Sequence, residues 1–523
     1  MMTIEMTMTM TIVVALIVTT VTIVVTMVTI VTKITKRMSI KQHIKIKQGS
    51  KVKQGLVLFI VWLSGALGLA YAQNIPDLGN VSETLWSKHE EISIGQTAYH
   101  QMQRRGMIHQ APADVDYLNY LGQKIGSLAQ TRVGLHFYLT QSLSVNAFAM
   151  PGGYVGVNAG LVLLTDNEHE LAGVLAHEIA HISQNHIARS VLAAKDRQWA
   201  NAAAAAASIL LATTSDSSDL GASGVSAVIA NETQQQLNII RQHEKEADRV
   251  GRDLIEKSGF NPLGMQLFFA KLFTPEYAAN TPAFLLTHPM PVDRQADIDD
   301  LRQKNQQLSS SDEYYLFRAR LQADYLAQET IDSTVTQALA SASPQVRSAG
   351  HYLSALQAVK QGQINQAQRT IEKMSSRMQK NRDVQLLMAK LHLLQNETNA
   401  AMRLYERLWG KFIGDSVVGY DFAHFLNERG QHQRAAEILS QLIDANPLNA
   451  QLYWLYGEVL GRLNQVGMQK KVVIRYYETV GNFEQALIQV NIALQQTTLD
   501  WQDRAALEAK AKTLKQQIEQ SER

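Results

Sequence analysis

The chain has 523 residues, of which 46% are hydrophobic and 18% are charged, and it contains no cysteine. This length implies more than one domain, and the lack of cysteine excludes disulfides, thiol nucleophiles and zinc–thiolate sites. The formal net charge of +2 is unevenly distributed, because residues 1–72 carry eight Lys or Arg and a single acid, Glu5. The rest keeps 41 of the 49 basic and 46 of the 47 acidic residues, and this mildly acidic balance does not favour a nucleic-acid partner.

Residues 1–37 read as a low-complexity leader. Residues 7–32 are an uncharged run of Thr, Val, Ile and Met with little else. A transmembrane segment is one reading, but so many β-branched residues make a poor helix. We interpret the leader as the product of a start site assigned too far upstream, with Met38 as the true initiator.

Residues 38–72 resemble a secretory signal peptide. Five lysines between positions 41 and 53 precede an apolar stretch at 56–69, and Ala70, Tyr71 and Ala72 form a small–x–small cleavage pattern. The pattern predicts export to the periplasm, with the mature protein beginning near Gln73 and at most loosely bound to a membrane. The alternative is an uncleaved inner-membrane anchor, because residues 54–76 carry no charge and are nearly long enough to span a bilayer.

Residues 146–164 predict a strand, a Gly-Gly turn and a second strand. β-rich residues stand on both sides of the turn, which contains Met150, Pro151, Gly152 and Gly153. The simplest interpretation is a hairpin that packs beneath the helix that follows.

His177, Glu178 and His181 form a His-Glu-x-x-His motif. Residues four apart share one helix face, so both imidazoles can reach a single metal ion while Glu178 projects beside it. Two neutral nitrogens, one further protein ligand and an open water position make a catalytic zinc site, where a carboxylate can take the water's proton during peptide hydrolysis. Chance spacing is the alternative, but the surrounding apolar residues indicate a buried helix, where unpaired histidines would be costly.

Residues 201–236 lie between this motif and the next acidic helix. Six alanines open the segment, and a Ser-, Gly- and Asp-rich centre interrupts it. The pattern fits a helix–loop–helix lid over the cleft, or a mere flexible insertion.

Residues 241–252 predict a second helix that carries Glu244, Glu246 and Asp248. Glu244 and Asp248 share a face, whereas Glu246 points away. A glutamate from this helix could complete a His-His-Glu site, with a carboxylate one turn later holding a ligand imidazole. A solvated charged face is the alternative, since charge runs usually are solvated.

Further histidines occur outside the motif. His288, between Thr287 and Pro289, lies in a segment that proline keeps out of a helix, and a lone loop histidine is usually a surface residue. We interpret His169, His186 and His243 as non-ligands.

Taken in chain order, these four segments resemble the zinc gluzincins related to the CAAX prenyl protease and the HtpX-type heat-shock protease. They are the Met150–Gly153 turn, the motif of His177 and His181, the block from Glu244 to Asp248, and Thr287 with His288 and Pro289. The exported, repeat-bearing branch of the family is the most similar, over about residues 80–500. The resemblance implies an α+β zincin-like metalloprotease domain with a small sheet.

The resemblance also implies roles for the second helix and for His288. The family's Glu-x-x-Ala-Asp motif falls on Glu244, Ala247 and Asp248, which implies that Glu244 is the third ligand of one zinc ion per chain. Asp248 would then hold a zinc-bound histidine. The resemblance places His288 near the metal, where it would occupy the open position at rest or stabilise the oxyanion during catalysis.

In this family a strand beside the cleft pairs with extended substrate. The resemblance therefore implies substrate-binding roles for Met150, Gly152, Gly153 and Tyr154. Backbone pairing tolerates varied side chains, which suits a protease acting on unfolded chains.

From about residue 313 the chain is helical in pattern and repeats. Segments of the form Gly/Asn-x-x-x-x-Ala begin at Gly362, Asn396 and Gly430, at spacings of 34 residues, which is the tetratricopeptide period. A further copy begins at Gly481, and an intervening unit loses its small residue at Gln469. Such repeats stack into an α-solenoid with a concave binding surface.

The sequence thus predicts a mainly α protein with a metallopeptidase domain at 73–312 and tetratricopeptide-like repeats at 313–523. The predicted function is an exported zinc endopeptidase that degrades misfolded or misassembled envelope proteins, while its repeats dock substrate or, by resemblance, the outer-membrane assembly machinery. The alternative is a chaperone or scaffold for that assembly whose protease site is usually latched, that is, held in a closed and inactive state.

Overall fold

The computed structural model describes residues 87–194, 234–273, 282–289, 308–495 and 501–522. The predicted leader (1–37), the predicted signal peptide (38–72) and nearly all of the predicted lid (201–236) lie outside these residues. No helix within the described ranges is both long enough and apolar enough to cross a membrane.

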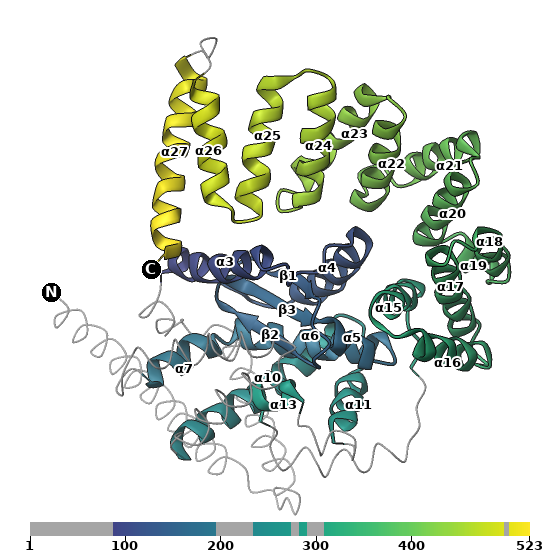
Figure 1. Cartoon of the computed structure of the whole chain (residues 1–523). Helices are drawn as coiled ribbons and strands as arrows, with labels where there is room; N and C mark the ends of the chain where they lie inside the picture. The colour runs from purple at the N-terminus through teal and green to yellow at the C-terminus, as the bar shows by residue number, and fades with distance from the viewer. Residues whose placement is uncertain (1–86, 195–233, 274–281, 290–307, 496–500, 523) are drawn as a thin grey trace, which may run out of the picture. The chain divides into compact units, whose positions relative to one another are not determined.

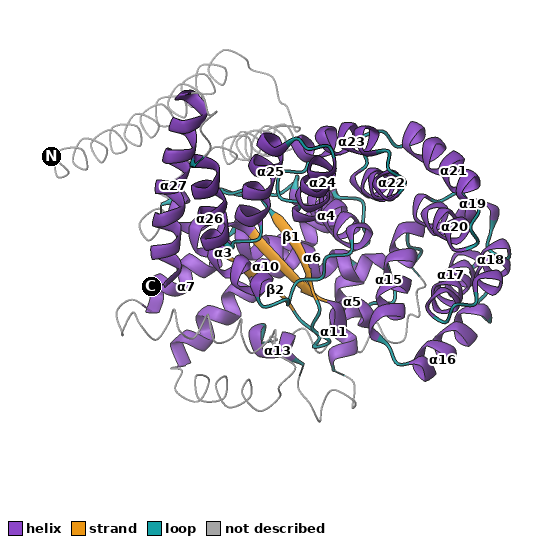
Figure 2. Ribbon diagram, turned by 45° about the horizontal axis from the view of Figure 1, so that its top comes forward, coloured by secondary structure: helices purple, strands orange, loops and turns teal. Residues whose placement is uncertain are grey.

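A three-stranded sheet lies in the N-terminal half (Figure 2). Its order is β1 (His136–Thr140), β3 (Tyr154–Asn158) and β2 (Ala147–Met150), with β1 parallel and β2 antiparallel to β3. The turn between β2 and β3 is the short 3-10 segment η2 (Pro151–Gly153), where Gly152 has a φ of 76° that disfavours any side chain. The predicted hairpin is therefore confirmed in the described residues.

The second strand of this hairpin is shorter than predicted. It ends at Asn158, and the rest of the predicted strand is the helix α5 (Ala159–Leu164). An apolar run of this length is compatible with a buried strand or a buried helix, and periodicity does not separate them. The backbone carbonyl of Leu143 lies 2.0 Å from where a Cβ on Gly160 would stand, so the helix begins where only glycine fits.

The helix α6 (Glu168–Ser183) lies at the centre of the first hydrophobic core. Its N-cap is Asn167, whose side chain accepts a hydrogen bond from the Glu170 backbone N–H. Glu168 and Glu170 in the first turn interact favourably with the helix dipole. Both α10 (Gln234–Lys257) and α11 (Leu263–Leu272) pack on α6. At Gly173 an added Cβ would stand 2.7 Å from Met265, so the absence of a side chain lets α11 approach closely.

Four further helices lie in the described residues of the N-terminal half. They are α3 (Lys88–Arg104), α4 (Pro112–Gly126), α7 (His186–Ala194) and α13 (Ala283–Thr287). Among them, α4 packs on both β1 and α6, and α3 packs on the η2 turn.

The C-terminal half consists of helices that follow one another in chain order, from green to yellow in Figure 1. They are α15 (Asp312–Tyr325), α16 (Gln328–Leu339), α17 (Pro344–Lys360), α18 (Ile364–Glu372), α19 (Ser376–Gln379), α20 (Arg382–Leu394), α21 (Thr398–Lys411), α22 (Ser416–Glu428), α23 (His432–Ala445), α24 (Ala450–Arg462), α25 (Val466–Thr479), α26 (Phe483–Leu494) and α27 (Trp501–Glu522).

The predicted repeat positions are turns between paired helices. Gly362, Asn396, Gly430 and Gly481 all have positive φ, between 61° and 74°, and so does Asn464, which stands 34 residues after Gly430. The left-handed conformation ends one helix and starts the next. The predicted small residues Ala367, Ala401, Ala435 and Ala486 are all fully buried.

The unit that lost its alanine has a glycine on the facing helix. The terminal amide nitrogen of Gln469 lies 2.6 Å from where a Cβ on Gly461 would stand, so the Gln469 side chain lies against Gly461. The fold class is therefore as predicted, an α+β peptidase domain followed by tetratricopeptide-like repeats.

The helix α15 belongs to both halves. Its side chains Tyr314, Phe317 and Leu321 lie in the core built around α6, whereas Leu316 and Ala319 lie in the core of the first repeats. The predicted boundary at 312/313 coincides with the start of this shared helix.

Candidate metal centre

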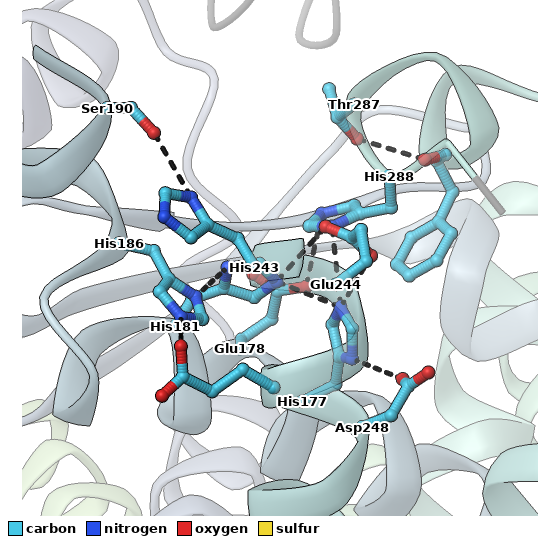
Figure 3. A network of polar contacts seen from close by, with 12 residues as sticks. His177, Glu178, His181, His186, Ser190, His243, Glu244, Asp248, Thr287 and His288 are labelled. Atoms are coloured by element: carbon cyan, nitrogen blue, oxygen red, sulfur yellow. Dashed lines mark hydrogen bonds and ion pairs between the residues drawn. The ribbon is translucent and has the colours of Figure 1, made fainter. Parts of the chain in front are cut away.

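The His-Glu-x-x-His motif lies on α6 (Figure 3). His177 and His181 are one turn apart, and their ring centroids are 4.6 Å apart. Their Nε2 atoms face each other at 3.0 Å. Both rings and Glu178 are buried, so α6 presents two imidazoles and a carboxylate to the interior of the peptidase half.

Glu244, the acid of α10 that the family resemblance implied as a ligand, reaches both histidines. Its carboxylate oxygens lie 3.3 Å from Nε2 of His177 and 3.4 Å from Nε2 of His181. A single ion can therefore contact both rings and this carboxylate.

His288 also enters the centre. It caps the C-terminus of α13, a short helix that the sequence did not predict, and it is buried. Its Nδ1 lies 3.0 Å from Glu244 Oε1 and 3.4 Å from His177 Nε2, and its Nε2 lies 3.4 Å from Glu178 Oε1.

The backbone and an aromatic ring hold His288 there. The His288 backbone N–H donates to the carbonyl of Phe284, and the two side-chain rings stack 4.6 Å apart. The Phe284 backbone N–H in turn donates to the carbonyl of Val145, just before β2. His288 is thus a buried residue fixed to the edge of the sheet and not the surface loop residue that its isolation in the sequence suggested.

Four residues converge closely enough to hold one cation. A nitrogen from each of His177, His181 and His288 and an oxygen of Glu244 all lie within 4.8 Å of one another. Nitrogen and carboxylate ligands in a closed pocket suit zinc. These residues therefore fit the ion that the motif predicts.

Each motif histidine has a second partner behind its ring. His177 Nδ1 lies 3.2 Å from Asp248 Oδ1, the pairing predicted for Asp248. His181 Nδ1 lies 2.9 Å from Nδ1 of His186, and His186 Nε2 lies 3.2 Å from Glu246 Oε2. The sequence interpretation set His186 and Glu246 aside, and the structure shows both in contact with the centre's outer side.

Helical periodicity could not predict the position of His186, because the helix ends at the turn around Asn185. Asn185 has a φ of 54°, which turns the chain between α6 and α7. Continued as one helix, the sequence would carry His186 away from the ligand face, but the turn directs it back toward His181. His243 stacks on His186, and His169 binds the backbone of Asn261 and Ser309, so neither belongs to the four-donor group.

Burial dominates the chemistry of Glu178. It raises the pKa of the carboxyl group, and the neighbouring imidazoles of His288 and His177 offset this only in part. A hydrogen bond from the backbone N–H of Ala149 also lowers this pKa, but burial remains the larger effect. A carboxylate with a raised pKa in such a pocket is well suited to accept a proton from water.

The other residues of the centre differ in their electrostatics. Burial raises the pKa of Glu244, but His288 and His177 lower it well below its usual range, so the group stays ionised. Burial lowers the pKa of His177, but hydrogen bonds to Asp248 and Glu244 raise it overall to about 10. Burial and the neighbouring His177 lower the pKa of His181 well below its usual range, so the centre combines an ionised carboxylate with a neutral imidazole, as zinc ligands require.

The sheet offers one unpaired edge beside this centre. Strand β3 is paired on both sides, and the outer side of β1 is bridged by Ile108 and by the backbone of His109. Within the described part of the chain, this leaves the outer edge of β2 without a strand partner, and there the Ala149 backbone forms a hydrogen bond with Glu178 of α6.

Of the residues predicted to bind substrate, Met150 is the last residue of β2, and Gly152 and Gly153 form the turn. Tyr154 lies in the central strand, its backbone paired on both sides and its ring stacked on that of Tyr99. Only Met150 among the four therefore borders the unpaired edge.

Known proteins share these features. Residues 122–302 match the model of peptidase family M48. The beta-barrel assembly-enhancing protease of Yersinia pestis is 30% identical over 389 residues, covering 73% of this chain and 79% of that protein. Its counterpart from Escherichia coli (strain K12) is 28% identical over 456 residues, covering 85% of this chain and 92% of that protein.

A shorter relative matches the peptidase half. The metalloprotease LoiP of Escherichia coli (strain K12) is 31% identical over 193 residues, covering 36% of this chain and 72% of LoiP. The matched family region contains all four residues of the donor group. The chain therefore belongs to peptidase family M48 and is a zinc metalloendopeptidase.

Proposed function

We propose that this chain is an exported zinc endopeptidase that degrades misfolded or misassembled envelope proteins. The observation that carries the proposal is the convergence of His177, His181 and Glu244 beside Glu178. The names of the relatives, which refer to assembly of β-barrels, support the outer-membrane context.

In this proposal His177, His181 and Glu244 hold the zinc ion. When bound there, zinc supplies a Lewis acid that lowers the pKa of water and polarises a carbonyl. Asp248 fixes the ring of His177 through its Nδ1.

Glu178 acts as the general base. Its buried carboxylate takes a proton from the attacking water as the oxygen adds to the scissile carbonyl carbon. The resulting carboxylic acid then returns that proton to the departing amine as the C–N bond breaks. Glu178 is ionised again at the end of the cycle, and the water has been divided between the two products.

Strand β2 provides the substrate groove. An extended chain laid along its unpaired edge would form backbone hydrogen bonds and leave the side chains free to vary. Met150 ends this edge, and the Gly152–Gly153 turn limits its length. Such recognition selects unfolded segments over folded proteins.

The repeats dock the protein that is to be cleaved, or the outer-membrane assembly machinery that delivers it. Stacked helical pairs present a concave surface and bring no catalytic group of their own. The predicted location is the periplasm, after cleavage of the signal peptide, with peripheral membrane contact.

A second candidate function rests on His288. Its Nδ1 occupies a place within the donor group, 3.0 Å from Glu244 Oε1. A fourth protein ligand would take the position that water needs, so the protein would act mainly as an assembly chaperone or scaffold with a latched protease site.

One experiment tests the leading proposal. Zinc content and casein cleavage are measured on the purified protein and on Glu178→Gln. Stoichiometric zinc with cleavage only in the wild type is expected. Absence of zinc from the wild type, or full cleavage by the variant, would contradict it.

A further inference from the structure

The outer side of His181 is held by a chain of groups that belongs to α7 and α10. His181 directs Nε2 into the donor centre, 3.4 Å from Glu244 Oε1, and Nδ1 away from it. That Nδ1 lies 2.9 Å from Nδ1 of His186 (Figure 3). His186 is almost fully buried, so no solvent competes for this contact.

The position of each proton follows from this geometry. Two facing ring nitrogens form a hydrogen bond only if one of them carries a proton and the other does not. An Nε2 that binds a metal is unprotonated, so neutral His181 carries its proton on Nδ1 and donates it to His186. Neutral His186 then carries its own proton on Nε2 and donates it to Glu246, 3.2 Å away.

The far end of this chain is anchored. Arg189 Nη1 donates to the same Glu246 oxygen at 2.7 Å, which keeps Glu246 charged and in place. The His186 ring also stacks on His243, with centroids 4.3 Å apart and planes 11° apart, so rotation of the ring is restricted. His186 therefore meets His181 with a fixed nitrogen and a fixed orientation.

We propose that His186 and Glu246 are positioning residues for the metal centre, fixing the tautomer and orientation of His181 as Asp248 does for His177. This inference rests on the proposed role of His181 as a zinc ligand. A neutral histidine replaces the usual carboxylate directly behind His181, and the carboxylate lies one residue further out. A carboxylate, that of Asp248, thus supports His177 directly, whereas a neutral imidazole, that of His186, supports His181.

The test measures zinc binding directly, by competition with a chromogenic chelator, on the full protein. His186→Phe keeps a stacking ring but removes both nitrogens, and it should weaken zinc binding about 10- to 100-fold. His186→Asn keeps an acceptor near the Nδ1 position and should recover most of that loss. His243→Phe is the matched control. It keeps an aromatic ring stacked on His186 and leaves the hydrogen-bonded chain of His181, His186 and Glu246 unchanged, so its zinc affinity should stay within about threefold of wild type.

Cobalt substitution supplies a second readout. The visible absorption of the cobalt-loaded protein reports ligand geometry, and it should shift in His186→Phe and return toward wild type in His186→Asn. Zinc affinity of His186→Phe within about twofold of wild type, with an unchanged cobalt spectrum, would overturn the proposal. Equal losses in His186→Phe and His243→Phe would also overturn it, because they would assign the effect to ring packing.

Two further outcomes separate the possible failures. If His186→Phe does not fold, Glu246→Gln tests the proposal in its place. This variant should weaken zinc binding several-fold, and an unchanged zinc affinity would overturn the proposed role of His186 and Glu246. If the wild type binds no zinc, or His181→Ala leaves the affinity unchanged, the ligand assignment of the proposed function fails instead.

Discussion

Arg320 of α15 and Asp114 of α4 form an ion pair whose carboxylate is fully buried. The same guanidinium binds Asp383 of α20 through Nη1, at 2.6 Å. One side chain therefore satisfies two buried carboxylates, one from the peptidase half and one from the repeats.

The first prediction concerns this junction. Arg320→Met should destabilise the protein by about 3–5 kcal/mol, because it removes the guanidinium that two buried carboxylates share and leaves Asp114 with His109 alone and Asp383 with Arg382 alone. Unfolding in urea, followed by circular dichroism, measures the change. Arg434→Met is the matched control, because its partner Glu406 and Arg434 itself are both about half exposed, and it should cost less than about 1 kcal/mol. Similar small losses in both variants would show that the junction is not stabilised by this pair.

The second prediction concerns Glu178. Glu178→Gln should reduce peptide cleavage at least about 100-fold, because an amide cannot accept the proton of the attacking water. The variant should retain its zinc, since Glu178 stands outside the group of four converging donors. Metal analysis and a fluorescent peptide assay measure both effects. Loss of metal would mean that Glu178 is a ligand.

The third prediction concerns His288. His288→Ala should raise the basal cleavage of a model substrate, because it removes a nitrogen that competes for the metal's open position. The double variant with Glu178→Gln should be inactive, which attributes the activity to this site. If His288→Ala loses activity while keeping its zinc and its fold, the residue stabilises the transition state and is no latch.

The fourth prediction concerns the pH dependence of stability. Burial raises the pKa of Asp421 from 3.8 to about 6. Because the folded protein favours the protonated form, the stability contributed by protonated Asp421 is full below pH 4 and is lost as the pH rises to about 6.

Asp421→Asn removes this dependence. The variant should be more stable than wild type at pH 7.5, by at most about 3 kcal/mol, and equal to it near pH 4. Thermal melts at the two pH values measure the difference. Asp332→Asn, at an exposed position of α16, is a control that should change the stability equally at both pH values. A stability gain of the same size at both pH values would rule out ionisation of Asp421 as the cause.

The fifth prediction concerns the N-terminus. We expect the protein made in cells to begin at Gln73, after cleavage behind Ala72, and to be recovered from the periplasm. N-terminal sequencing and fractionation measure this. A start before residue 56, with the protein resistant to salt and carbonate extraction of membranes, would establish the anchor instead.

Local patterns predicted the repeats and the motif helix. The 34-residue period appears in the sequence because each unit uses the same left-handed turn, from Gly362 through Asn396 to Gly430. His177 and His181 were predictable for a similar reason, because their shared face depends only on helical geometry.

Contacts between segments that are distant in the sequence could not be predicted from local patterns. Spacing along α10 allowed three acids as ligands, and only the family resemblance selected Glu244. The position of Glu246 depends on α7, and His186 depends on the turn at Asn185, so neither follows from one helix. The helical form of residues 159–164 depends on packing that an apolar run does not encode.

The burial of α6 also determines how the molecule opens. Every residue from 170 to 182 is buried, so no face of this helix can separate from its neighbours by itself. Its backbone amides should therefore exchange with deuterium only through global unfolding of the peptidase half. The two motif histidines stand in this helix, whereas His288 directly follows the five-residue helix α13. Any motion that exposes the centre within a catalytic cycle must come from the segments around α6.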